Sequence, residues 1–277
     1  MDKLKADYLK SELYKCKDYL KGKGYNVVYL CVYGSQNYGL DIYTDDYKSD
    51  IDFKAVIIPT LDDLIYNCKP ISTTIEYNDG QIDLKDIRSW TETLVKANPA
   101  YIETIYTPLY IIEEGYEEYM TSILKFRVPL LYSLRAQFTR AVYGMAKEKE
   151  AAFEHPYPSC ISDIEKYKYS RKQLHHIIRL FYLLYSYMYD GCFSLEPTEE
   201  QKIFLLDIKI GKYKYEDACK IRDEYMQKLK VLKDTYLDSI DEKTINYEVK
   251  EYVLDNARKI IKKSIIKEAK GIDLDRA

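Results

Sequence analysis

Two aspartates lie two residues apart at the start of an apolar segment, a short distance after a Gly-Ser pair. They are Asp50 and Asp52, and the pair is Gly34-Ser35. Because alternate residues of a strand point to the same side, both carboxylates would project from one face of a strand that begins near Ile51. Neighbouring carboxylates repel each other unless a cation lies between them, and Mg²⁺ prefers such oxygen ligands and brings substrate phosphates with it. A small turn lets backbone N–H groups and a hydroxyl approach those phosphates, so the spacing predicts a site for metal-dependent nucleotidyl transfer.

An edge strand whose aspartates simply face solvent is the alternative interpretation. The residues that follow are apolar from Ile51 to Ile58, apart from Asp52 and Lys54, which favours a strand buried in a covered sheet. Two carboxylates at the mouth of a buried strand cost free energy unless a ligand compensates them. The flanking sequence therefore favours the metal site over the solvated strand.

This segment resembles the DNA-polymerase-β-like nucleotidyltransferase superfamily. The signature of that superfamily is a Gly-Ser turn, a gap, and then Asp-x-Asp on the next strand, and Gly34, Ser35, Asp50 and Asp52 match it residue by residue. In one departure, the gap between Ser35 and Asp50 is a few residues longer than usual, with the extra residues at 42–48. The resemblance implies that Asp50 and Asp52 bind Mg²⁺ or Mn²⁺ and that Gly34 and Ser35 bind the nucleotide.

The segments GSQNYGL and SDIDFKAVIIP resemble one subgroup of the superfamily more closely, the RNA-ligase-associated predicted nucleotidyltransferases. Two later segments are also similar to that subgroup: KANPAYIETIY at 96–106 and RKQLHHIIRL at 171–180. The matching pieces extend in patches from about residue 34 to about residue 191. The resemblance implies an NTP substrate, with ATP expected, and RNA as an acceptor.

A third carboxylate is expected to help bind a second metal ion and to activate the acceptor hydroxyl. The candidates Glu76, Asp83 and Asp86 lie in two strand-like segments around an Asp-Gly turn. Asp83 alternates with Ile82 and Leu84, as the superfamily pattern of a third aspartate on a neighbouring strand requires, and is the preferred candidate for the catalytic and metal-binding role. Asp86 would face the other way and could equally cap the helix that follows.

A cationic stripe is predicted on the helix at 171–180. At about 100° per residue, Lys172, His176 and Arg179 share one side, opposite an apolar side that would form the core. From the residues alone, a solvated polar face is the simpler interpretation. The resemblance implies instead that this helix lines the active-site cleft and that the three residues bind the triphosphate, with His175 a weaker candidate.

The elements that must position these residues form an α+β fold. Apolar periodicity and turn residues predict a small mixed β-sheet with helices, followed by an all-helical C-terminal domain. The expected domains are a nucleotidyltransferase core at 1–125 and a helical domain at 126–277, packed across the active-site cleft. The predicted helices are 3–21, a short one after Pro59, 88–106 with an interruption at Asn98-Pro99, one around 130–145, 162–189, 198–209, 215–238 and 243–269; the predicted strands are 26–33, 51–58 and a hairpin around 78–80.

Composition limits the function classes. The 277 residues include 42 Lys and Arg against 45 Asp and Glu, a net charge of −3, so any contact with nucleic acid must come from a local patch. The six cysteines form no C-x-x-C pair and there are three histidines, which argues against a zinc site and predicts reduced thiols, no disulfide-linked partner and a cytoplasmic protein. No secretory signal or membrane-spanning segment is expected.

Three functions remain open at this point. The leading one is Mg²⁺-dependent transfer of NMP from an NTP to an acceptor hydroxyl, on RNA that awaits end modification or repair. The second is NMP transfer to a protein or small molecule, as in AMPylation, toxin neutralisation or antibiotic modification. The third is a non-catalytic nucleotide-sensing module, which the intact Gly34-Ser35 and Asp50-x-Asp52 argue against.

Overall fold

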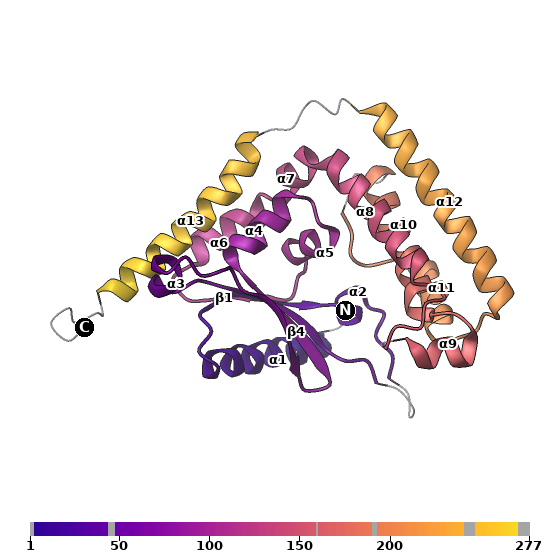
Figure 1. Cartoon of the computed structure of the whole chain (residues 1–277), viewed down its shortest axis with the longest axis horizontal. Helices are drawn as coiled ribbons and strands as arrows, with labels where there is room; N and C mark the ends of the chain where they lie inside the picture. Colours follow the sequence, from indigo (N-terminus) through magenta and orange to yellow (C-terminus); the bar gives the residue numbers. More distant parts are fainter. Residues whose placement is uncertain (1–2, 44–47, 159, 190–192, 241–246, 271–277) are drawn as a thin grey trace. The chain divides into compact units, whose positions relative to one another are not determined.

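The computed structural model describes residues 3–43, 48–158, 160–189, 193–240 and 247–270 (Figure 1). Their contacts divide the chain into two compact units. The first contains Met1–Asn37, Asp41–Ser133 and Asn246–Ala277, and the second contains Tyr38–Leu40 and Leu134–Ile245. Residues 44–47, within the predicted longer gap, lie outside the described residues.

The first unit is built on a mixed sheet with the strand order β3-β4-β2-β1-β5. The strands β2 and β4 pair in parallel, and the other neighbours are antiparallel. The Asp-Gly turn closes the β3–β4 hairpin, as predicted. The strands are β1 (Val27–Tyr33), β2 (Asp52–Ile57), β3 (Ser72–Tyr77), β4 (Gly80–Asp86) and β5 (Tyr110–Ile112).

The two faces of this sheet have different partners because side chains alternate along each strand. One face packs its apolar residues against α1 (Lys3–Gly22), where Leu9, Leu13 and Leu20 are fully buried. The other face presents Tyr29, whose hydroxyl donates to the Thr104 carbonyl at 2.6 Å and whose ring lies near Trp90. Figure 1 shows α1 and α4 (Ile87–Val95) on opposite sides of the sheet. The predicted catalytic aspartate Asp52 belongs to the α4 side.

Helices surround the sheet in the first unit and make up most of the second. The remaining elements of the first unit are α2 (Ser35–Tyr38), α3 (Leu61–Ile65), α5 (Pro99–Ile102), the 3₁₀ turn η1 (Glu103–Ile105), α6 (Glu117–Lys125), α7 (Arg127–Ser133) and α13 (Tyr247–Ala269). Those of the second unit are α8 (Arg135–Ala151), α9 (Ile161–Tyr167), α10 (Arg171–Tyr189), α11 (Glu199–Lys209) and α12 (Tyr215–Ser239).

The α+β class and the predicted strands are confirmed, but helix boundaries differ in two places. The helix expected around 130–145 is two helices that meet at Leu134. Apolar residues continue at helical spacing across this break, so the periodicity could not reveal it. The helix expected at 162–189 is broken at Lys168, which adopts a left-handed conformation with φ +70°. The strand β5 and the helix α6 were not predicted.

The contacts also group the chain differently from the predicted boundary at residue 125. The C-terminal helix α13, expected in the helical domain, packs against α4 and α6 of the first unit. Its buried residues include Val249, Val253 and Ile260. Amphipathic periodicity predicts that such a helix has a buried face, but it does not say which surface covers that face.

Candidate active site

Asp52 is the first residue of β2 and lies opposite Tyr33 on β1. Its Oδ1 accepts a hydrogen bond from the Gln81 N–H at 3.2 Å, which ties the carboxylate to the start of β4. Asp50 precedes the strand and is exposed, because β2 begins one residue later than the expected Ile51. Strand alternation therefore orients Asp52 alone, and the surrounding loop positions Asp50.

The Gly34-Ser35 turn lies directly against Asp52. Gly34 has φ +76°, a conformation that residues with a side chain rarely adopt, and a Cβ added there would stand 3.2 Å from Asp52 Oδ2. Ser35 is the first residue of α2. The structure thus brings together Gly34 and Asp52, which the sequence placed 18 positions apart.

Gln36 connects this turn to Asp50 and was not predicted as a site residue. Its Nε2 donates to the Tyr43 hydroxyl at 2.7 Å and to the Asp50 carbonyl at 3.3 Å. Its side chain is fully buried, and its Oε1 has no hydrogen-bond partner among the described residues. The motif GSQNYGL could have indicated this role, since a glutamine directly after Gly-Ser is close enough to hydrogen-bond to the loop that follows the turn.

The loop between the turn and Asp50 is closed at its base. The Ser49 N–H donates to the Ile42 carbonyl, and the Ile42 N–H donates to Ser49 Oγ, both at 2.9 Å. On the other side of the turn, Thr107 Oγ1 donates to Asn37 Oδ1 at 2.8 Å. Both ends of the segment between Gly34 and Asp50 are therefore held by hydrogen bonds.

Asp83 lies on the predicted face but has its own partners. It is in register with Lys54 of β2, on the same side of the sheet as Asp52. Its Oδ2 accepts from Lys54 Nζ at 2.5 Å and from the Tyr101 hydroxyl at 2.7 Å. Burial and the hydrogen bond to Asp83 raise the pKa of Tyr101, so the phenol stays protonated as a donor. The ion pair of Lys54 with Asp83 was not predicted from the sequence.

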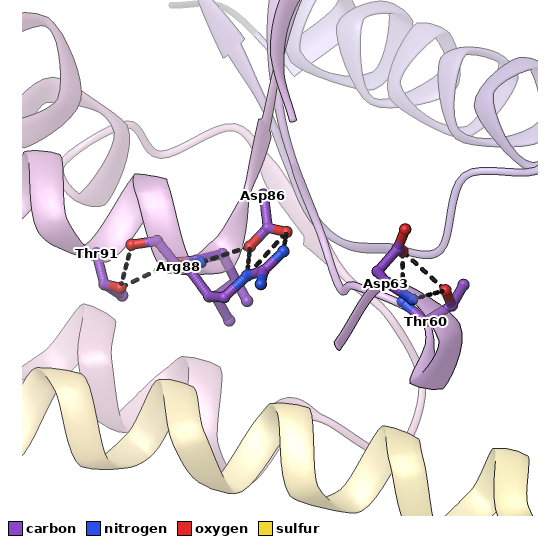
Figure 2. A network of polar contacts seen from close by, with 6 residues as sticks. Thr60, Asp63, Asp86, Arg88 and Thr91 are labelled. Atoms are coloured by element: carbon purple, nitrogen blue, oxygen red, sulfur yellow. Dashed lines mark hydrogen bonds and ion pairs between the residues drawn. The ribbon is translucent and has the colours of Figure 1, made fainter. Parts of the chain in front are cut away.

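The other two candidates for the third carboxylate have different surroundings. Asp86 caps α4, since its Oδ1 accepts from the Arg88 N–H at 2.8 Å, and both of its oxygens bind the Arg88 guanidinium (Figure 2). With 2% of its surface exposed, Asp86 serves the helix start, as the capping interpretation predicted. Glu76 is exposed on β3, which forms one edge of the sheet.

The donor set near Asp52 fits a hard divalent cation. Asp50 and Asp52 offer carboxylate oxygens, which Mg²⁺ and Mn²⁺ prefer, and Gly34 leaves open the space that a side chain would fill beside Asp52 Oδ2. Across the described part of the chain, no group of three or more His, Cys, Asp and Glu side chains is arranged to hold a metal ion. Asp83 Oδ2 accepts hydrogen bonds from Lys54 and Tyr101, and the predicted role of Asp83 as a third metal ligand stays a prediction.

A cavity of about 640 Å³ opens beside Asp50 within the first unit. Its lining includes Ile51 and Phe53, which face the α1 side of the sheet, and aromatic side chains such as Tyr8 and Tyr77. Asp50 belongs to the described lining, whereas Asp52 does not. The cavity is therefore on the side of β2 opposite to Asp52, and Asp50 lies at the edge between the two.

The predicted cationic stripe belongs to α10 in the second unit. Lys172 is exposed and His176 is half-buried, but Arg179 is only 6% exposed, so the interpretation of the stripe as a solvated polar face does not hold for Arg179. The reason lies in Tyr38, which joins the second unit's core and places its ring 4.2 Å from the Arg179 guanidinium carbon. Burial covers the apolar stem of an arginine while its planar head stacks on an aromatic ring.

Both histidines of α10 are held in the neutral form. Burial, together with the charge of Arg179, lowers the pKa of His175 to about 3 and that of His176 well below its ordinary value. A neutral His176 offers a hydrogen-bonding group and no positive charge at neutral pH. The predicted nucleotide-binding roles of Lys172, His176 and Arg179, and the predicted cleft that would unite them with Asp50 and Asp52, stay predictions.

Comparison with known proteins identifies the family. The model of the RNA repair pathway DNA polymerase beta family, RlaP, matches residues 11–184, more than half of the sequence and a range that contains every predicted site residue. The chain belongs to this family, so it is a polymerase-β-like nucleotidyltransferase protein connected with RNA repair. No curated protein matches the sequence.

Solved structures with a partly similar fold include that of one nucleotidyltransferase-like protein. It is the crystal structure of a nucleotidyltransferase-like protein from Exiguobacterium sibiricum, with 13% sequence identity and a TM-score of 0.30, covering 76% of this chain and 69% of that one. Within the described residues, none of the helices is long and apolar enough to cross a membrane.

Proposed function

We propose that this protein transfers NMP from an NTP, with ATP as the expected donor, to a hydroxyl at an RNA end. The observation that carries the proposal is the close approach of Gly34 to Asp52, because a Gly-Ser turn beside a strand carboxylate is the arrangement that the polymerase-β-like resemblance implies for binding the NTP and its metal ion. The family supports RNA as the acceptor, since its description names RNA repair. Asp50 and Asp52 would hold Mg²⁺ or Mn²⁺.

In this reaction the acceptor oxygen attacks the α-phosphorus of the NTP as the hydroxyl loses its proton to solvent water. The bond from the α-phosphorus to the bridging oxygen breaks, and pyrophosphate leaves with the electron pair. The bound cation would neutralise the charge that develops on the phosphate oxygens. NMP then remains joined to the acceptor through the new P–O bond.

The chain's own residues contribute positioning. Gly34 keeps the space beside Asp52 open, and Ser35 offers a hydroxyl and an N–H at the same turn. Gln36 holds the Asp50 backbone in place through its 3.3 Å hydrogen bond. Lys172 and Arg179 would contact the triphosphate, as the subgroup resemblance implies, and supply positive charge where pyrophosphate leaves.

The test is incubation of the purified chain with each labelled NTP, Mg²⁺ or Mn²⁺, and a panel of RNA, DNA, protein and small-molecule acceptors. We expect label on RNA, with release of pyrophosphate. Label on a protein or small molecule instead would favour AMPylation or antibiotic modification, and NTP binding without transfer would favour the nucleotide-sensing module.

Two variants make the assignment specific. Asp52→Asn and Asp50→Asn should abolish transfer and leave thermal stability equal or higher, since repulsion between the carboxylates is relieved. Asp238→Asn, at an exposed position of α12, is the matched control and should keep wild-type turnover. An Asp52→Asn protein that folds and retains full turnover contradicts the metal site.

A further inference from the structure

A positive charge is built into the sheet face beside Asp52. Lys54 follows Asp52 by two residues on β2, so both side chains project to the same side. Lys54 is only 7% exposed, and lysine is rarely buried to this extent unless its charge is paired. The pairing is provided by Asp83, whose Oδ2 lies 2.5 Å from Lys54 Nζ.

Two tyrosine rings enclose the same ammonium group. Its nitrogen lies 4.4 Å from the ring centre of Tyr33 and 4.2 Å from that of Tyr101. Both distances are within the range in which a cation is attracted to an aromatic ring, and the attraction grows when water is excluded. The Tyr101 hydroxyl donates to the same Asp83 oxygen, so Lys54, Asp83 and Tyr101 form a closed set of contacts.

The neighbours of Lys54 and Asp83 include a neutral thiol and a second cation. Cys31 lies opposite Lys54 in the β1–β2 pairing, and burial raises the pKa of its thiol to about 12, so it stays neutral. Lys85, on β4, lies 4.5 Å from the Tyr101 ring centre and is a second cation near the set, although burial lowers its pKa. A divalent cation at Asp83 would therefore lie beside a fixed ammonium and would be repelled by it.

We propose that the chain holds a single divalent cation, at Asp50 and Asp52, and that the Lys54 ammonium takes the place of a second one by neutralising Asp83. Lys54 is then a positioning residue that keeps Asp83 and Tyr101 fixed on the reacting face. This inference rests on the proposed metal site, and it replaces the expectation that Asp83 is itself a metal ligand.

The test counts metal ions, without nucleotide, by titrating the full chain with Mn²⁺ and measuring free Mn²⁺ by electron paramagnetic resonance. The wild type should bind one Mn²⁺. Asp83→Asn should also bind one, with its affinity changed by less than about threefold, whereas Asp52→Asn should weaken binding by at least about tenfold. Lys54→Met, which frees Asp83 from its cation, should raise the count to two.

Lys85→Met is the matched control, because Lys85 is a cation near Tyr101 that makes no ion pair with Asp83 among the described contacts. The Lys85→Met protein should still bind one Mn²⁺. Two Mn²⁺ ions on the wild type, loss of Mn²⁺ in Asp83→Asn, or a folded Lys54→Met protein that still binds one would each overturn the inference. If Lys54→Met does not fold, the counts for wild type and Asp83→Asn decide. Absence of any Mn²⁺ binding to the wild type would contradict the proposed metal site itself.

Discussion

The backbone of Gly34 lies so close to Asp52 that a Cβ at residue 34 would stand 3.2 Å from Asp52 Oδ2. This is tighter than an ordinary van der Waals contact, and Gly34 also has φ +76°. Two independent constraints, space and backbone conformation, therefore require glycine at the position where the phosphates are proposed to approach.

Replacing Gly34 by alanine should affect both stability and nucleotide binding. The left-handed backbone conformation costs a residue with a side chain about 1–2 kcal/mol, and the added methyl group presses on Asp52. We expect a lower melting temperature and weaker binding of a non-hydrolysable NTP, measured by isothermal titration calorimetry. Gly144→Ala is the control, because Gly144 lies in α8 with open space around it, and alanine there should stabilise by roughly 0.5–1 kcal/mol. Unchanged NTP affinity in folded Gly34→Ala would mean that the turn is structural only.

Asp86 should prove to be a structural residue. Asp86→Ala removes the cap of α4 and leaves the half-buried Arg88 without its carboxylate partner, so we expect a loss of about 1–3 kcal/mol in the free energy of unfolding. Chemical denaturation measures this loss, with the exposed Glu76→Ala expected to stay within about 0.5 kcal/mol of wild type. Mn²⁺ binding should be the same in both variants, and loss of Mn²⁺ on Asp86→Ala would restore Asp86 as a candidate ligand.

The sequence predicted the sheet well and the neighbours of its charged residues poorly. Alternation of Asp83 with Ile82 and Leu84 identified the correct face, since periodicity depends only on residues within one strand. The partnership of Asp83 with Lys54 depends on the parallel register of β2 and β4, which no local pattern encodes. In the same way, the helical stripe placed Arg179 on a polar face, and Tyr38, 141 positions earlier, covers it.

Substitutions at Arg179 and Tyr38 can distinguish a catalytic contribution of Arg179 from a structural one. If its guanidinium stabilises the leaving pyrophosphate, Arg179→Ala should lower kcat/KM by the equivalent of about 2–4 kcal/mol. Since Arg179 is also buried against Tyr38, stability will fall too, and kcat/KM must be expressed per folded molecule. Tyr38→Leu removes the ring contact while keeping the arginine, and it should cost about 0.5–2 kcal/mol of stability.

Lys230→Ala, at an exposed position of α12, controls for the loss of any surface cation and should change stability by less than about 0.5 kcal/mol. Lys172→Ala, the exposed member of the stripe, should reduce kcat/KM and leave stability near wild type. If Arg179→Ala, Lys172→Ala and Lys230→Ala have equal kcat/KM per folded molecule, the second unit contributes no charge to the reaction.

The neutral histidines of α10 should make the protein sensitive to acid. Burial and the Arg179 charge lower the pKa of His175 to about 3 in the folded state, whereas an unfolded histidine titrates near 6.5. Between these values the unfolded chain binds a proton that the folded chain does not, so stability is fully present above about pH 6.5 and falls as the pH drops toward 3. The slope is at most about 1.4 kcal/mol per pH unit for each such histidine. Urea unfolding from pH 7.5 to pH 4.5 measures this slope.

His175→Gln should flatten the dependence of stability on pH, and His155→Gln, at an exposed position outside α10, should leave that dependence unchanged. Equal slopes for wild type and His175→Gln would show that His175 is not kept neutral by the fold.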